Sequence, residues 1–180
     1  MKRSRIGLGL IALAAAGSLA LAGCASGGST AGSGEAKGGI ITANGSEPQN
    51  PLIPTNTNEV GGGKILDSIF AGLVYYAADG SAHNDLAESI ETEDATTYTI
   101  KIRKDAKFAD GTPVKAENFV KAWNYGADVA NEQLSSYFFE DIEGFSYDES
   151  VAELPGLKVV DDTTFTVTLN KAASDFPLRL

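Results

Sequence analysis

The sequence predicts an α/β fold in which short strands and helices alternate along the chain. Three stretches support this prediction: an alternating run at residues 97–103, a turn followed by helical periodicity at residues 108–123, and two β-rich runs within residues 157–169. The chain has 180 residues, of which 43% are hydrophobic and 21% are charged. This length and composition are sufficient for one globular body with a sizeable core.

Residues 97–103 have the period of a half-buried strand. Tyr98, Ile100 and Ile102 fall on one side, and threonine, lysine and arginine residues occupy the positions between them. Because side chains alternate across a strand, this spacing gives one apolar face and one polar face. We therefore expect a strand that covers part of the core.

Residues 108–123 combine a turn with the first part of a helix. Asp110-Gly111 is a strong turn signal, since glycine adopts positive φ without steric cost. Lys115 precedes the helix and cannot accept an amide hydrogen bond, so the helix start is expected to be less stable by about 1 kcal/mol. We expect Trp123 to be buried and to anchor the helix. The apolar residues recur at the spacing of one helical face: Ala116, Phe119, Val120, Trp123 and Ala127.

Residues 157–160 and 164–169 are predicted to form a hairpin around Asp161-Asp162-Thr163. Within the second strand, alternate apolar residues are expected to share one face and to face the core. These residues are Phe165, Val167 and Leu169.

The folded body is expected to begin near Ile40, with a short strand at residues 40–43 and a helix at residues 64–74. Gly61-Gly62-Gly63 precedes the expected helix. A glycine triplet before a helix can form a phosphate cradle, but the Lys-Ser/Thr ending of a P-loop is missing and no predicted strand leads into it. We therefore do not predict a phosphate site.

The charge and the residue counts exclude several classes of protein. The formal net charge is −10, which argues against nucleic-acid binding, since that affinity comes largely from Lys and Arg on phosphates. It also argues against attraction to an anionic membrane surface. One Cys and one His exclude an internal disulfide and a Cys/His zinc cluster within the chain. We predict no cofactor, no metal site and no catalytic residue.

A secreted hydrolase is the alternative from a different class. It would need His83 as its base, but His83 lies in a polar stretch beside Asn84 and Asp85, where an exposed side chain is expected. The Gly-x-Ser-x-Gly motif of a nucleophile elbow does not occur. The acidic run at residues 140–143 is interpreted as a solvated face rather than as an acid–base pair.

The first residues have the order of a secretory signal. Lys2, Arg3 and Arg5 are followed by an almost wholly apolar run at residues 6–21, which is too short for a confident membrane span. Leu21-Ala22-Gly23-Cys24 then matches the lipobox of bacterial lipoproteins. We predict that residues 1–23 are a signal peptide and that Cys24 is lipidated. Residues 24–39 are rich in Gly, Ser and Ala and are expected to form a flexible linker.

The string at residues 108–123, with Arg103-Lys104 before it, resembles the signature of the family 5 extracellular solute-binding proteins. Leu86-Ala87-Glu88-Ser89 and Gly72-Leu73-Val74 are similar to further landmarks of that family. The resemblance implies a type II periplasmic-binding-protein-like fold with two lobes, of which only the N-terminal portion is present. Residues 40–78 would then be part of the first lobe, residues 79–180 would be most of its small extra domain, and the second lobe would be absent.

The resemblance also implies a function and a site. Members of the family capture short peptides for ABC importers, so the implied partners are a peptide ligand, ABC permease subunits and the outer face of the cell membrane, which is reached through the lipid anchor. The implied ligand-binding residues are Asn58, Glu59 and Val60, just ahead of the first helix, together with Leu134. Other cargoes known for the family are nickel, haem, sugars and opines, and a purely structural lipoprotein is a further alternative.

Overall fold

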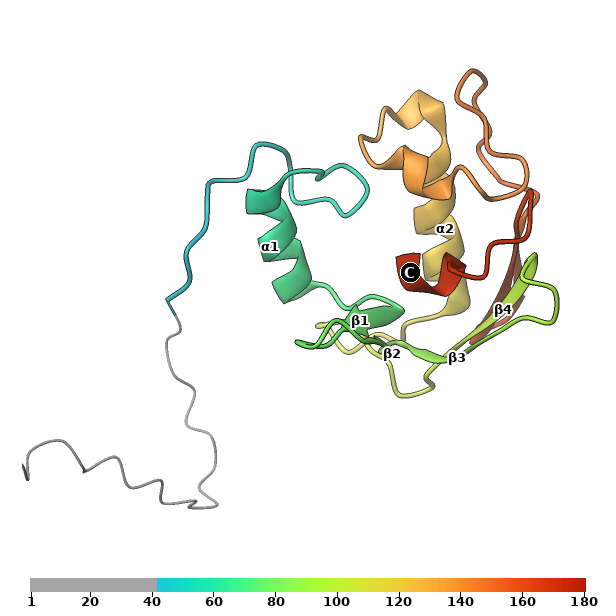
Figure 1. Cartoon of the computed structure of the whole chain (residues 1–180), viewed down its shortest axis with the longest axis horizontal. Helices are drawn as coiled ribbons and strands as arrows, with labels where there is room; N and C mark the ends of the chain where they lie inside the picture. Colours follow the sequence, from blue (N-terminus) through green and yellow to red (C-terminus); the bar gives the residue numbers. More distant parts are fainter. Residues whose placement is uncertain (1–41) are drawn as a thin grey trace, which may run out of the picture. The chain divides into compact units, whose positions relative to one another are not determined.

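The computed structural model describes residues 42–180 (Figure 1). The predicted signal peptide, the lipidation site Cys24 and the predicted linker all lie outside the described residues. So do Ile40 and Ile41 of the first expected strand, while Thr42 and Ala43 are irregular, so no strand forms in the described part of that stretch. Among residues 42–180, none of the helices combines the length and the apolar character needed to cross a membrane.

The centre of the fold is a four-stranded antiparallel sheet in the order β3-β4-β6-β5. Its core face is apolar because alternate residues of β4 and β6 lie opposite each other: Ile100 pairs with Phe165, and Tyr98 pairs with Val167. All four of these side chains are buried. The predicted strand at residues 97–103 and the predicted hairpin are thereby confirmed. The strands are β3 (Ala87–Glu91), β4 (Thr97–Ile102), β5 (Leu157–Asp161) and β6 (Thr164–Thr168).

Helix α2 (Ala116–Ala127) packs against β5 and β6 and confirms the predicted helix. As expected, the Lys115 side chain does not cap it. Three other contacts hold the helix start. Asn118 Oδ1 accepts a hydrogen bond from the Lys115 amide at 2.7 Å, and the Asp162 carbonyl oxygen accepts one from the Ala116 amide at 2.9 Å. Lys115 Nζ lies 3.1 Å from the Asp162 carboxylate. These contacts offset part of the expected loss.

Trp123 is only half-buried, so the prediction of a buried anchor is wrong in part. One side of the indole packs on the core, with ring centroids 5.5 Å from Phe165 and 6.1 Å from Phe139. The rest of the ring lines two cavities described below. Helical periodicity gave the correct face of α2, but it could not show that two cavities lie beside Trp123.

Helix α1 (Val60–Ile69) starts and ends earlier than predicted. The three glycines form its first turn, and Val74 belongs to strand β1 (Val74–Tyr76) rather than to the helix. The early start follows from Glu59, whose carboxylate accepts a hydrogen bond from the Gly62 amide at 2.9 Å and caps the helix. Strand β1 pairs antiparallel with β2 (Ala82–Asn84).

Residues 42–180 also contain three short 3₁₀ helices: η1 (Val129–Asn131), η2 (Ser136–Phe139) and η3 (Phe176–Arg179). The acidic run at residues 140–143 is a solvated face only in part, because Glu140 and Glu143 are exposed as predicted but Asp141 is not. Only 13% of the Asp141 side chain is exposed, and its carboxylate lies 2.6 Å from Arg179 Nη1 and 3.4 Å from Lys171 Nζ. Ile142 is buried in the core. This run therefore fixes η3 to the rest of the body.

Candidate functional site

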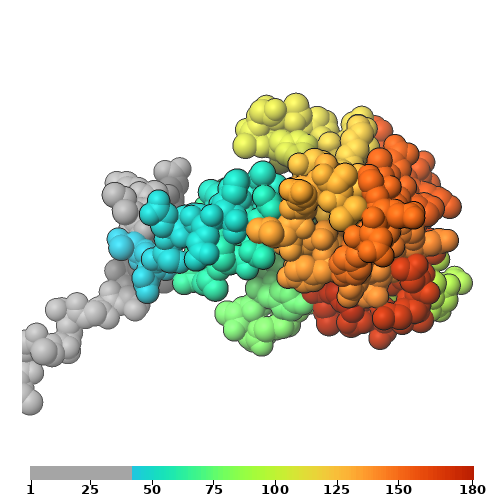
Figure 2. All heavy atoms as spheres, turned by 90° about the horizontal axis from the view of Figure 1, so that it is seen from above, coloured from blue at the N-terminus to red at the C-terminus, as the bar shows by residue number. Residues whose placement is uncertain are grey.

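Two loops that are distant in sequence lie against each other in front of α1, and we call residues 51–60 and 133–135 the two-loop wall. The Thr55 carbonyl oxygen accepts a hydrogen bond from the Ser135 amide at 3.0 Å. Thr55 Oγ1 donates to Gln133 Oε1 at 2.9 Å, and Asn56 Oδ1 accepts from the Leu134 amide at 3.3 Å. Figure 2 shows the same contact as cyan atoms beside orange ones.

The first loop of the wall is also fixed internally. The Ile53 carbonyl oxygen accepts hydrogen bonds from the Asn56 and Thr57 amides at 2.9 and 3.0 Å, and Thr57 Oγ1 donates to the Pro51 carbonyl oxygen at 2.7 Å. Gly126 of α2 allows the close approach of this loop. A Cβ atom added at Gly126 would lie 2.5 Å from Thr55 Cγ2 and 2.7 Å from the Phe139 ring.

All four residues predicted to bind ligand belong to this wall. Asn58, Val60 and Leu134 are exposed. Asn58 makes no hydrogen bond to any other residue within the 42–180 range. The Leu134 amide is bound to Asn56, only two positions before Asn58. The structure therefore joins into one surface two segments whose proximity no sequence pattern revealed.

Glu59 has a structural role in the wall. Its carboxylate accepts hydrogen bonds from the Gly62 and Gln49 amides. The pKa of Glu59 is lowered, chiefly because the Gly62 amide stabilises the charged carboxylate. This carboxylate already occupies the N-terminus of α1, where a phosphate would bind. The glycine triplet is therefore part of a self-capped helix and not a phosphate cradle.

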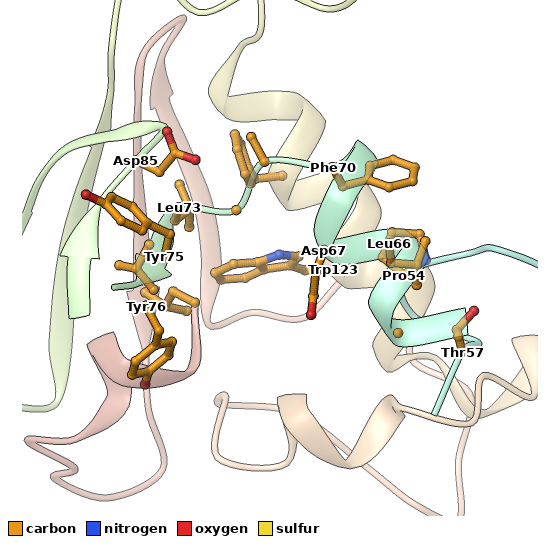
Figure 3. A pocket seen from close by; sticks show the side chains of 16 residues that line it. Pro54, Thr57, Leu66, Asp67, Phe70, Leu73, Tyr75, Tyr76, Asp85 and Trp123 are labelled. Carbon is orange, nitrogen blue, oxygen red and sulfur yellow. The ribbon is translucent and has the colours of Figure 1, made fainter. Parts of the chain in front are cut away.

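A cavity of about 720 Å³ lies between α1, β1 and α2. Its walls include Leu66 from α1 and Phe70 directly after that helix, Tyr75 and Tyr76 from β1, and Trp123 from α2. Figure 3 shows the Trp123 indole between the two tyrosines and α1. None of the four predicted ligand-binding residues lines this cavity. The sequence offered only the closely spaced aromatics at positions 70, 75 and 76 as a signal.

A smaller cavity of about 260 Å³ lies on another side of Trp123. It is mainly apolar, with Phe138, Phe139 and Phe176 among its lining residues. Pro54, Trp123 and Leu180 line both cavities. The indole of Trp123 therefore lies between the two cavities.

His83 is exposed, as expected, although it lies in strand β2 rather than in a loop. Its ring stacks on Tyr75, with centroids 5.5 Å apart, and Nε2 lies 2.8 Å from Ser81 Oγ. Ser81 Oγ also lies 2.6 Å from Asp79 Oδ1. When the hydroxyl donates to this carboxylate, His83 Nε2 must donate to Ser81 and cannot act as its base. This arrangement supports the turn between β1 and β2 rather than hydrolysis.

No group of three or more His, Cys, Asp or Glu side chains in the described part of the chain is arranged to hold a metal ion. Of the four residues predicted to bind ligand, Asn58 offers an amide side chain, Glu59 a carboxylate that caps α1, and Val60 and Leu134 exposed apolar side chains. Such a surface can bind a ligand by hydrogen bonds and apolar contact.

Comparisons with known proteins identify relatives of this chain. Residues 81–180 match the family described as "Bacterial extracellular solute-binding proteins, family 5 Middle". The periplasmic oligopeptide-binding protein OppA of Escherichia coli (strain K12) is 34% identical over 97% of this chain and 32% of its own length. The oligopeptide-binding protein OppA of Bacillus subtilis (strain 168) is 32% identical over 69% of this chain and 24% of its own length.

A solved structure of Haemophilus influenzae OppA in complex with RPPGFSPFR is similar in fold, with a TM-score of 0.67 and 32% sequence identity. The match covers 73% of this chain and 27% of that one. The type II periplasmic-binding-protein fold predicted from the sequence is thus confirmed for the part that is present. This chain spans about a quarter to a third of the length of these relatives. From the family match and these identities, the chain belongs to the bacterial extracellular solute-binding proteins of family 5.

Proposed function

We propose that this chain is the first-lobe portion of a lipid-anchored substrate-binding protein, which captures short peptides outside the membrane and delivers them to the permease of an ABC importer. Family 5 solute-binding proteins are binding proteins of transport systems rather than enzymes. The observation that carries the choice of peptides is the similarity, at 34% and 32% identity, to two relatives named as oligopeptide-binding proteins.

In this proposal the two-loop wall is one side of the peptide site. An extended peptide needs main-chain donors and acceptors, and Asn58 is an exposed residue whose backbone and side-chain amide make no hydrogen bond within residues 42–180. Val60 and Leu134 add exposed apolar contact beside them. Glu59 keeps α1 in place through its cap. The other side of the site, and the groups that bind the peptide termini, would come from a second lobe.

The domain division is part of the same proposal, with residues 40–78 in the first lobe and residues 79–180 in its small extra domain. All four strands of the large sheet, and α2, fall within residues 79–180. The boundary between residues 78 and 79 lies in the turn of the β1–β2 hairpin, whose strands pair across it. The hairpin would therefore connect the two parts rigidly.

The anchor can be tested in cells that lack the gene. The unaltered gene should restore uptake of a labelled pool of tri- to pentapeptides, and the membrane-extracted protein should begin at a diacylglyceryl-modified Cys24. Cys24→Ser should release the protein from the membrane and abolish uptake, because the lipid is the proposed attachment. Ser26→Ala, in the same segment, is the matched control and should change neither result.

Two outcomes would contradict this proposal. A mature chain that begins at another residue, or membrane retention that survives Cys24→Ser, would exclude the lipid anchor. If cells without the gene still take up peptides but no longer take up another nutrient, the family assignment would stand and that nutrient would be the cargo.

A further inference from the structure

Gln133 is buried inside the two-loop wall, with only 8% of the residue exposed, although glutamine is mostly an exposed residue type. Its side-chain amide bonds two different segments. Oε1 accepts a hydrogen bond from Thr55 Oγ1 at 2.9 Å, and Nε2 donates to the Asn131 carbonyl oxygen at 2.6 Å. Because a carbonyl oxygen can only accept, the amide nitrogen must face Asn131, which leaves the amide oxygen for Thr55. One buried side chain thus joins the first loop of the wall to the second loop and to η1.

The bonds of Gln133 lead back to helix α2. Asn131 Nδ2 donates to the Tyr125 carbonyl oxygen, in the last turn of α2, at 2.9 Å. Thr55 packs so closely on α2 that a Cβ atom added at Gly126 would lie 2.5 Å from its methyl group. Helix α2 itself packs on the sheet. A binding surface is held more precisely when supporting hydrogen bonds connect it to rigid elements, and Gln133 makes that connection for the wall.

The residue before Gln133 has an unusual backbone conformation. Glu132 has a φ of +50° and lies in the left-handed region, which residues other than glycine rarely adopt. Such a conformation persists only where the surrounding contacts enforce it, and it occurs most often at functional sites. The bonds from Gln133 to Thr55 and Asn131 are contacts of this kind, because they fix the residue that directly follows the turn.

Gln133 and Ser135 point inward on either side of Leu134. They are 8% and 6% exposed, whereas Leu134 between them is 45% exposed. The Thr55 carbonyl oxygen accepts a hydrogen bond from the Ser135 amide at 3.0 Å, so Thr55 is bonded to both inward residues. Thr55 belongs to the loop that carries Asn58. The bonds at Thr55 therefore set how Leu134 lies relative to this loop.

We propose that Gln133 is a positioning residue for peptide binding, which holds the two loops of the wall in one arrangement through its bond to Thr55. Gln133 does not contact the peptide in this account, since its side chain is buried. The proposal rests on the proposed function, because it takes the wall as one side of the peptide site. A wall that is already ordered binds more tightly, since less freedom is lost when the peptide arrives.

A double-mutant cycle in the full-length, two-lobed protein tests this proposal. Thr55→Val removes the hydroxyl group and keeps the methyl group beside Gly126, and Gln133→Met removes the amide. By calorimetry, each variant should bind about 5- to 10-fold more weakly to the peptide that the unaltered protein selects from a tri- to pentapeptide pool, because the remaining partner is left unpaired. The double variant should bind no more weakly than either single variant. Thr55→Ser restores the hydroxyl group and should bind at least about 3-fold more tightly than Thr55→Val.

Thr57→Val is the matched control for the cycle. Thr57 Oγ1 donates to the Pro51 carbonyl oxygen within the first loop and not to the second loop. Its effect on binding should therefore add to that of Gln133→Met.

Hydrogen exchange separates positioning from a general loss of stability. Without any peptide, Thr55→Val and Gln133→Met should each speed exchange of the Ser135 amide by about 5- to 10-fold, because the contact between the loops opens more often. The Ile102 amide, which bonds the Thr163 carbonyl oxygen at the end of β4, should exchange at an unchanged rate. Equal acceleration at both amides would overturn the proposal in favour of a general structural role.

Two further outcomes would overturn the proposal: additive losses of binding in the double variant, or unchanged binding in either single variant. If the unaltered protein binds none of the peptides, the proposed function fails. If it binds them and the cycle shows no coupling, only this inference fails.

Discussion

Replacing Phe165 by alanine is expected to lower the free energy of unfolding by about 3–5 kcal/mol. Phe165 is fully buried in β6, opposite Ile100 of β4. Its ring centroid lies 5.9 Å from Phe119 and 5.5 Å from Trp123. The substitution therefore removes the aromatic contacts that Phe119 and Trp123 of α2 make with the sheet. Because the free energy of unfolding of a domain is typically only about 5–15 kcal/mol, a loss of this size would clearly lower the midpoint of chemical denaturation.

Phe138→Ala is the matched control for this prediction. Phe138 is exposed and stacks only on Tyr137 among the aromatic side chains of residues 42–180, with centroids 4.5 Å apart. Its truncation should cost less than about 1 kcal/mol. Equal unfolding midpoints for the Phe165 and Phe138 variants would mean that the sheet and α2 do not share the core described above.

Asp141→Asn is expected to lower the free energy of unfolding by about 1–3 kcal/mol at neutral pH. The Asp141 carboxylate is mostly shielded and bonds Arg179 Nη1 at 2.6 Å, with Lys171 Nζ at 3.4 Å. The amide keeps the shape of the side chain but removes the charge that both cations face. Asp148→Asn, on an exposed loop, is the matched control and should have little effect.

The effect of Asp141 should depend on pH in a defined direction. The hydrogen bond from Arg179 is the main cause that lowers the pKa of Asp141, with Lys171 adding to it and burial opposing it. The unfolded chain has the ordinary aspartate pKa of about 3.9. The stabilisation is therefore fully present above about pH 4 and is lost as the pH falls through the lower folded-state pKa. Denaturation curves of the two proteins should converge in acid, and a difference that grows in acid would refute this role.

The elements that were predicted correctly are those with a local and strongly periodic signal. The alternation through Tyr98, Ile100 and Ile102 predicts a strand without any knowledge of the strand that pairs with it. The 3.6-residue spacing from Ala116 predicts a helix in the same way. The turn at Asp110-Gly111 is equally local. Gly111 has a φ of +86°, and Asp110 Oδ1 accepts a hydrogen bond from the Thr112 amide.

The features that were missed depend on contacts between distant segments. Asp141 is shielded because Arg179, 38 positions later, returns to it. The segment around Leu134 joins the loop before α1 through bonds to Thr55 and Asn56, which no local pattern in either stretch encodes, so only the family resemblance placed Leu134 in the same site as Asn58. Trp123 is half-buried because it lines two cavities whose walls come from distant segments, including Pro54 and Leu180. Helix α1 begins earlier than its apolar spacing predicts because Glu59 caps it through the Gly62 amide.

The most direct test of the account is isothermal titration of short peptides into two forms of the protein. The two-lobed form should bind a pool of tri- to pentapeptides with a Kd of about micromolar or tighter, and residues 40–180 alone should give no heat, because enclosure needs both walls. Leu134→Asp should weaken binding by the two-lobed form, whereas Val160→Asp, at an exposed site on β5, should not. Micromolar binding by residues 40–180, or no binding by the two-lobed form, would contradict the proposal that peptides are held between this wall and a second lobe.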